Sequence, residues 1–163
     1  MPFESVLFAK SVAVALPAGW LALGAYNNVR FPVSNMGAVT GVLTLEGMRE
    51  ACPDIEDAVM RRAINSPALV AFLYWGIVLA EIVVTAGLLF SAACLLCASL
   101  GHIWGEQGLW LANLSVIDFT AIWGAFLVGG QWFSYWLNFA ESQKTHFHML
   151  QWGLLTLIFL NVG

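Results

Sequence analysis

Four long apolar runs set the pattern of this chain. They cover residues 6–26, 68–100, 109–136 and 146–162, the last being the shortest, and polar residues gather between them. A helix needs about 20 apolar residues to cross a hydrocarbon core roughly 30 Å thick, because each residue adds about 1.5 Å. The pattern therefore predicts an all-α fold, a four-transmembrane-helix bundle of up-down topology that forms a single integral membrane domain over 1–163.

The second run carries clear start and stop signals. Ser66 provides an N-cap hydroxyl, and Pro67 suits the first helical position. Gly101 and His102 close the run. A continuous helix over 68–100 is longer than a bilayer requires, so we expect it to tilt, bend or project beyond the lipid.

A long polar loop, residues 27–66, separates the first two runs. After Pro53, acidic residues fill a first helical turn and Arg61 and Arg62 fill the last, as the helix dipole favours. Apolar residues between them recur at helical spacing. We therefore expect a short amphipathic helix in this loop, lying on the membrane surface.

Composition supports a membrane location and limits the function classes. The 163-residue chain is 60% hydrophobic and only 10% charged, and its mean hydropathy is +0.80. A soluble domain of this size has too much surface to hide so many apolar side chains. The net charge is −4 and the sequence has no basic patch, which argues against nucleic acid as a partner. The lipid bilayer is the partner that the composition predicts.

Cysteines and histidines do not indicate a metal or cofactor. Cys94 and Cys97 have C-x-x-C spacing, but they lie within an apolar run, where thiols serve as small packing residues. His102 ends the second run and His146 begins the fourth, so the two are expected at opposite membrane faces, too far apart to share a haem. We therefore expect no cofactor and no metal held by this chain alone. The alternative is a histidine supplied to a haem or metal site shared with another subunit.

Charged residues within the apolar runs are the candidates for function, because charge in lipid is costly. Lys10 lies near the end of its run, from where it can extend to the surface. Glu81 and Asp118 both fall near the membrane centre, with Asn113 preceding Asp118 on the same helix. One hypothesis is an acid pair that binds a proton, a cation or a polar solute. The other, which we favour, is a protonated carboxyl that hydrogen-bonds between helices, with Glu81 the stronger candidate.

Several short motifs are similar to those of a known family. Asn27 and Asn28 follow the first run, and Trp75 and Glu81 lie in the second. The most specific motif is Gly-Gly-Gln-Trp-Phe-Ser-Tyr-Trp at 129–136, and its distinguishing residues are Gln131, Trp132, Phe133 and Trp136. In these motifs the chain resembles the bacterial predicted small integral membrane protein family, catalogued as domain of unknown function 2165. The family has glutamate where this chain has glutamine. The resemblance implies a four-helix membrane fold and brings no activity with it.

The function that the sequence favours is a non-catalytic one. No nucleophile–base pair, phosphate-binding loop or H-E-x-x-H motif occurs, so we expect no enzyme. Small residues such as Gly76, Gly87 and Gly124 suit close helix contacts, within the bundle or with a neighbour. We therefore expect an accessory or scaffold subunit of a larger bacterial membrane complex, associated with other membrane subunits or with copies of itself. The alternative is a channel or transporter for an ion, a proton or a small solute that uses Glu81 and Asp118.

The basic residues also predict an orientation. Those on one side of the predicted bundle are Arg30, Arg49, Arg61, Arg62 and Lys144, whereas the other side has only Lys10. The positive-inside rule places the more basic side in the cytoplasm. We therefore expect a bacterial inner membrane protein with both termini on the non-cytoplasmic side.

Overall fold

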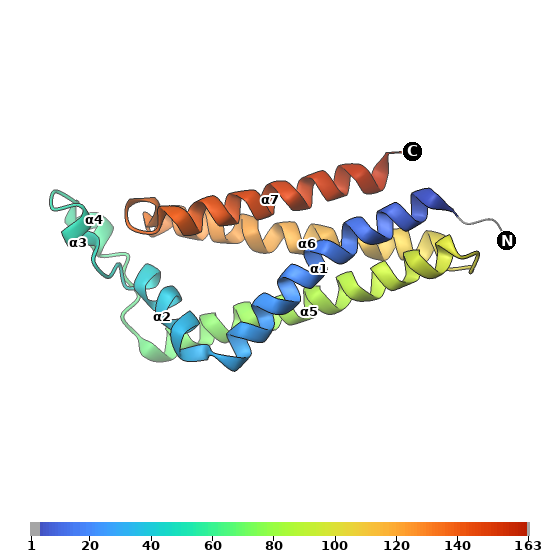
Figure 1. Ribbon diagram of the computed structural model, residues 1–163. Coiled ribbons are helices and arrows are strands. Elements are labelled where there is room, and N and C mark those ends of the chain that lie inside the picture. The colour runs from blue at the N-terminus through green and yellow to red at the C-terminus, as the bar shows by residue number, and fades with distance from the viewer. Residues whose placement is uncertain (1–3, 163) are drawn as a thin grey trace.

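The computed structural model describes residues 4–162, and every regular element within them is helical. Four long helices form the body: α1 (Ser5–Arg30), α5 (Pro67–Ser99), α6 (Gly105–Trp132) and α7 (Ala140–Asn161). Successive long helices run in opposite directions and pack side by side, α1 on α5, α5 on α6 and α6 on α7 (Figure 1). This arrangement confirms the predicted all-α, up-down bundle.

The signals around α5 act as predicted. Ser66 has an extended backbone, and its hydroxyl accepts a hydrogen bond of 3.4 Å from the Leu69 backbone N–H. Pro67 is the first helical residue, and α5 continues for 33 residues. The other long helices are displaced from the apolar runs. Helix α1 continues past the predicted end at residue 26 to Arg30. Helix α6 covers 105–132, whereas the predicted run was 109–136. Helix α7 begins at residue 140, six residues before the predicted start.

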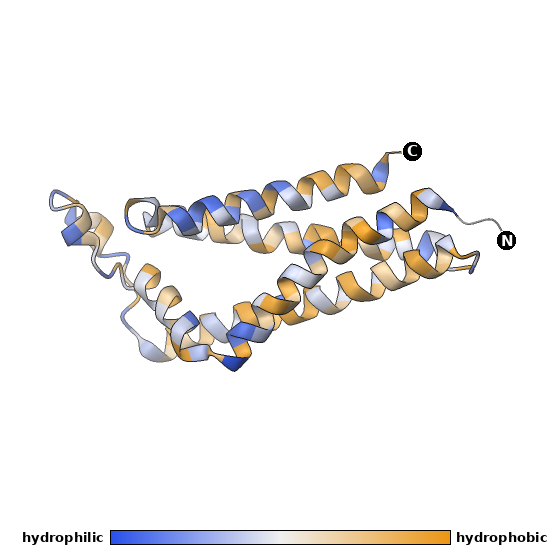
Figure 2. Ribbon diagram, in the orientation of Figure 1, coloured by the Kyte–Doolittle hydropathy of each residue, from blue (hydrophilic) through white to orange (hydrophobic). Residues whose placement is uncertain are grey.

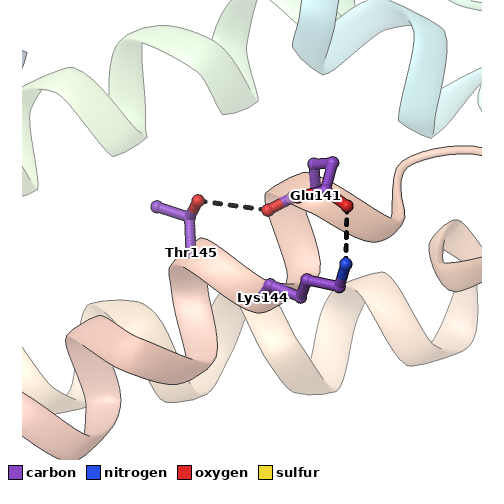
Figure 3. Close-up of polar contacts among 3 residues, drawn as sticks. All are labelled: Glu141, Lys144 and Thr145. Carbon is purple, nitrogen blue, oxygen red and sulfur yellow. Dashed lines mark hydrogen bonds and ion pairs between the residues drawn. The ribbon is translucent and has the colours of Figure 1, made fainter.

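Three of the helices in the described part of the chain are long and apolar enough to cross a membrane: α1, α5 and α6. The fourth predicted span, α7, has 22 residues, but its first turns are polar, as the blue colouring in Figure 2 shows. There Lys144 and Glu141 form an ion pair of 2.6 Å between largely exposed side chains. Thr145 donates to the Glu141 backbone carbonyl in the same turn (Figure 3). The bundle thus has three or four long apolar helices, and α7 is the most polar of them.

The connection between α1 and α5 is more structured than expected. Pro32 stops α1 and begins a second helix, α2 (Pro32–Leu43), which turns across one end of the bundle (Figure 1). The predicted amphipathic helix is short, since α4 covers only Asp57–Met60, and it is preceded by α3 (Met48–Ala51). The longest helix of the connection is therefore α2, which is largely apolar.

The half of the bundle nearer the termini is closely packed. Fully or almost fully buried side chains from all four long helices meet there: Val14, Leu88, Leu95, Ala112, Val116 and Leu160. Gly108 allows α6 to approach α5, because a Cβ at this position would lie 3.0 Å from Cys94 Cβ and 3.3 Å from the Leu95 backbone nitrogen. Cys94 is buried at this crossing and serves as a packing residue, as predicted, whereas Cys97 is exposed.

Lys10 belongs to this packed half. Its side chain is 5% exposed, and Nζ donates a hydrogen bond of 2.8 Å to the Leu160 backbone carbonyl in α7. The expectation that Lys10 extends to the surface is therefore wrong, because an acceptor lies within the bundle. The neighbouring Ser11 donates to the Ala92 carbonyl at 2.8 Å. These two side chains tie α1 to α7 and to α5.

Candidate functional site

The opposite half of the bundle surrounds a partly open cavity of about 410 Å³. Its walls come from α1, α5, α6 and α7, and α2 contributes a further wall at the end of the bundle. The short helix η1 (Tyr135–Leu137), between α6 and α7, completes the lining. Residues far apart in the sequence thus surround one space.

Glu81 lines this cavity and is the centre of its polar network. Its side chain is 5% exposed, and Oε2 accepts a hydrogen bond of 2.7 Å from Asn28 Nδ2. Tyr74, two turns earlier on α5, donates from its hydroxyl to the Asn28 backbone carbonyl, also at 2.7 Å. Asn28 is therefore held through both its side chain and its backbone. Within the described residues it is the only hydrogen-bond donor to Glu81.

The position of Asn28 follows from the way α1 ends. Pro32 has no backbone N–H and disfavours a helical conformation in the residue before it. Phe31 accordingly leaves the helix, with φ −127° and ψ 55°. The last carbonyls of a helix lack donors within that helix and need them from elsewhere. The Tyr74 hydroxyl supplies one, which fixes the end of α1 against α5 beside Glu81.

Aromatic side chains form much of the remaining wall: Trp20, Tyr74, Trp123, Phe126, Tyr135 and Phe139. Tyr135 reaches the cavity because the chain turns sharply after α6, where Ser134 has a left-handed φ of 53°. Its ring packs directly on Gly130, and a Cβ there would overlap the ring. Burial raises the pKa of the Tyr135 hydroxyl, which keeps this group protonated and neutral at physiological pH.

Several polar atoms around the cavity lack hydrogen-bond partners. Across residues 4–162, the buried side-chain atoms without one are Thr85 Oγ1, Trp123 Nε1, Tyr135 Oη and His146 Nδ1, and the last three belong to residues that line the cavity. The His146 ring stacks on Tyr135 with 6.0 Å between centroids and lies 5.6 Å from the Trp123 ring. Buried polar groups are almost always hydrogen-bonded, to water or to a ligand where the protein supplies no partner. Their concentration here makes this cavity the candidate functional site.

The predicted acid pair is not formed. Glu81 is the one acidic residue among the described residues that line the cavity, whereas Asp118 is exposed on the outer face of α6. Asn113 is half-buried, and its Oδ1 accepts a hydrogen bond of 2.6 Å from Asn161 Nδ2, which links α6 to α7 away from the cavity. Of these three predicted site residues, the structure brings only Glu81 to the cavity.

The motif residues noted in the sequence fall into two groups. Phe133 lines the cavity together with Asn28, and Trp136 is half-buried. The exposed members are Asn27, Trp75, Gln131 and Trp132. Trp132 links the end of α6 to the chain before α5 through two contacts with Arg62. The Arg62 guanidinium donates a hydrogen bond of 2.9 Å to the Trp132 backbone carbonyl and lies 4.6 Å from the centroid of the Trp132 ring.

Sequence reasoning missed Trp123, Tyr135 and His146 as site residues. Trp123 lies in an apolar run without a distinguishing feature, and the position of Tyr135 is typical of an interfacial aromatic residue. The available signal was Gly129-Gly130 shortly before aromatic residues, because a glycine lets a ring pack on the backbone. His102, unlike His146, is exposed at the turn between α5 and α6. The part of the chain that the structure describes has no group of three His, Cys, Asp or Glu side chains able to hold a metal ion.

Comparison with known proteins identifies the family. The family model described as "Predicted small integral membrane protein (DUF2165)" matches residues 6–163, nearly the whole chain. No curated protein and no solved structure matches. The matched region includes every helix that surrounds the cavity as well as the packed half of the bundle. The chain is therefore a multi-pass integral membrane protein that belongs to the family of predicted small integral membrane proteins.

Proposed function

We propose that this protein binds a small solute in the cavity at Glu81, as a carrier or receptor within the membrane and without catalysing a reaction. The observation that carries the proposal is a buried carboxyl group on a cavity that is also lined by three residues, each of which keeps a buried polar atom without a partner. A buried polar group left unpaired costs about 1–3 kcal/mol. A solute whose binding turns these side chains towards it and completes their hydrogen bonds would offset that cost.

The size and lining of the cavity support solute binding. Its volume of about 410 Å³ lies within the roughly 300–1,000 Å³ of ligand pockets, which are mostly apolar with a few convergent polar groups. A purely structural role for Glu81 would need only the hydrogen bond to Asn28. It would not need a cavity beside that bond, which forfeits packing contacts. The cavity therefore favours the solute-binding alternative over the accessory role that the sequence favours.

Filling the cavity tests the proposal. Gly24 lines the cavity on α1 and has no atom within 4 Å of the place where a Cβ would stand, so Gly24→Leu should place a side chain in the cavity and obstruct it without moving the backbone. Gly19 on the same helix is equally open but lies outside the cavity, which makes Gly19→Leu the matched control. Three compounds that share a benzyl group serve as probes: benzyltrimethylammonium, benzyl alcohol and phenylmethanesulfonate.

At least one probe is expected to raise the apparent Tm of the purified protein in non-ionic detergent. The stabilisation should disappear in Gly24→Leu and persist in Gly19→Leu. If all three probes leave the Tm unchanged, or if stabilisation survives in Gly24→Leu, the proposal is wrong.

A second candidate function, that of an accessory or scaffold subunit, is favoured by Asp118. Its side chain is exposed near the middle of α6, one of the helices able to cross the membrane. A charged Asp facing lipid costs about 2.5–3.5 kcal/mol on insertion scales, so a neighbouring chain that hydrogen-bonds to it would be stabilising. Ala121 lies one turn from Asp118 on α6 and is exposed, which permits close approach of another helix.

Mild detergent extraction followed by mass spectrometry of co-purifying chains tests this second candidate. Partner chains that accompany the wild type and are lost from Asp118→Leu would support it. Recovery of both proteins as lone monomers would contradict it.

We further propose a bacterial inner-membrane location with both termini on the non-cytoplasmic side. The support is the concentration of basic residues at the cavity end of the bundle. A membrane-impermeant thiol reagent applied to intact cells should label Gln107→Cys and not Arg61→Cys, with Cys52 and Cys97 replaced by serine. Both reporter positions are exposed. The reverse labelling pattern would overturn the orientation.

A further inference from the structure

We infer that the solute bound at Glu81 is an organic ammonium ion with an apolar body. Its positive nitrogen pairs with the carboxylate, and its body lies against the aromatic wall. The inference rests on the proposed function, because it names the chemical class of the ligand for the same cavity. Three observations carry it: the charge of the lining, the aromatic side chains, and the way in which Asn28 holds Glu81.

The charged residues of the lining indicate the sign of the ligand's charge. Within residues 4–162, Glu81 is the only acidic side chain that lines the cavity, and no lysine or arginine lines it. The single hydrogen-bond donor to Glu81 is the neutral amide of Asn28. Charges attract strongly where the dielectric is low, and the lining supplies no lysine or arginine to pair with this carboxylate. A cation would stabilise the ionised form of Glu81, whereas an anionic solute would be repelled by it, so a cation is the complementary ligand.

The aromatic wall distinguishes an organic cation from a metal ion. The Trp20 and Trp123 rings meet edge to face with 5.3 Å between centroids, and Phe126 lies 5.5 Å from Trp123. Ring faces attract ammonium groups through the negative charge of their π-electrons, and the same rings bind hydrocarbon. Ca²⁺ and Mg²⁺ instead require six or more oxygen ligands, and the cavity has a single carboxylate. The lining therefore suits a cation that carries its own apolar groups.

The absence of lysine and arginine from the described lining also argues against a phospholipid headgroup. Such a headgroup places a phosphate next to its ammonium group, and phosphates in protein sites are usually paired with arginine or lysine. No such partner lines this cavity in the described part of the chain. An ammonium compound without a phosphate group avoids the repulsion between phosphate and Glu81.

Asn28 holds the carboxylate in place before a ligand arrives. Its amide occupies Oε2 at 2.7 Å, and its own backbone is fixed by the Tyr74 hydroxyl. The carboxylate is thus oriented at a junction of α1 and α5, and it requires little reorganisation on binding. Preorganisation of this kind raises affinity by lowering the entropy lost on association.

Isothermal titration calorimetry with the three benzyl probes, in non-ionic detergent, tests the ligand class. We expect benzyltrimethylammonium to bind about tenfold or more tightly than benzyl alcohol, and phenylmethanesulfonate not to bind. Glu81→Gln removes the charge and keeps an acceptor for Asn28. This change should weaken binding of the ammonium about tenfold or more, equivalent to about 1.4 kcal/mol, and leave benzyl alcohol unaffected. Asp118→Asn, which removes an acid outside the cavity, is the matched control and should change neither affinity.

The outcomes separate this inference from the proposed function. If the alcohol or the sulfonate binds as tightly as the ammonium, and Glu81→Gln changes neither, the ligand class is wrong while solute binding stands. If no probe binds the wild type, both ideas fail. Competition by added phosphatidylethanolamine would point to a lipid headgroup and also overturn the inference. Should Glu81→Gln fail to fold, Trp20→Leu provides a second test, because loss of its ring should weaken the ammonium more than the alcohol.

Discussion

The two halves of the bundle differ in the side chains that α6 turns inward. In the half that carries the termini these are small, Gly108, Ala112 and Ser115, and the helices lie in close contact. In the other half they include Phe119 and Trp123, and α1 diverges from α7 towards the α2 end (Figure 1). Distances between packed helices follow the size of the side chains at the contact. Small inward side chains of α6 therefore allow close helix packing in one half of the bundle, and large ones keep the helices apart in the other.

Polar groups differ between the two halves in the same way. In the packed half, Lys10 and Ser11 both donate to backbone carbonyls of neighbouring helices. In the cavity half, Trp123, Tyr135 and His146 each keep a buried polar atom without a partner. We therefore expect stability and the proposed solute binding to depend on different parts of one small fold. Substitutions in the two halves should separate the two properties.

The largest expected effect comes from truncating a packed side chain. Leu88 is fully buried, so Leu88→Ala should lower the free energy of unfolding by about 2–5 kcal/mol. Ile77→Ala, at the cavity wall, should cost less, about 1 kcal/mol, because this side chain is only half-buried and removes less apolar surface from solvent. Unfolding titrations in mixed micelles measure both. Equal losses would show that the cavity half is packed as tightly as the other.

A smaller effect is expected from adding one methyl group to α6. Gly108→Ala places a Cβ 3.0 Å from Cys94 Cβ and 3.3 Å from the Leu95 backbone, which cannot move easily, so we expect a loss of about 1–3 kcal/mol. Gly129→Ala on the same helix meets no atom within 4 Å and should be neutral or stabilise by up to about 1 kcal/mol through helix propensity. The apparent Tm of both variants provides the measurement. A stable Gly108→Ala protein would contradict the close approach of α5 and α6.

The smallest expected effect concerns Glu81. Glu81→Leu removes the acceptor for Asn28 and should destabilise the bundle by about 0.6–2 kcal/mol, as is typical of hydrogen bonds between membrane helices. Glu81→Gln retains an acceptor of the same shape and should leave the melting temperature nearly unchanged. Thermal melts in detergent compare the two. A Gln variant as unstable as the Leu variant would show that the charge itself holds the helices together.

Much of the bundle could be predicted from the sequence because its signals are local. Ser66 and Pro67 mark the start of α5 through an N-cap and a missing N–H, and both act as expected. Helix α2 was not predicted because its 12 residues are too few to cross a membrane. The polar residues on either side of it also made the whole connection look like a polar loop. The polar ends of α1 and α7 were missed for a related reason, since hydropathy marks apolar residues and not the limits of a helix.

The site could be predicted only in part. Glu81 is conspicuous as an acid within an apolar run, and its depth follows from its distance along α5. The rotation of a helix about its axis is harder to predict, because a helix that is apolar on all sides has no periodicity to mark its inner face. Asp118 was therefore paired with Glu81 although it lies on the outside of α6. The inward position of Lys10 was missed for the same reason.

The hydrogen bond from Lys10 to Leu160 joins residues 150 positions apart, and this separation has a consequence for biosynthesis. The ribosome delivers α1 well before α7, so Lys10 reaches the membrane before its acceptor has been made. Until then its ammonium group must remain with water or headgroups. The last turn of α7 then offers a carbonyl at a helix C-terminus, where a cation is favoured. We therefore expect the first helix to reach its final depth only after the last helix has been inserted.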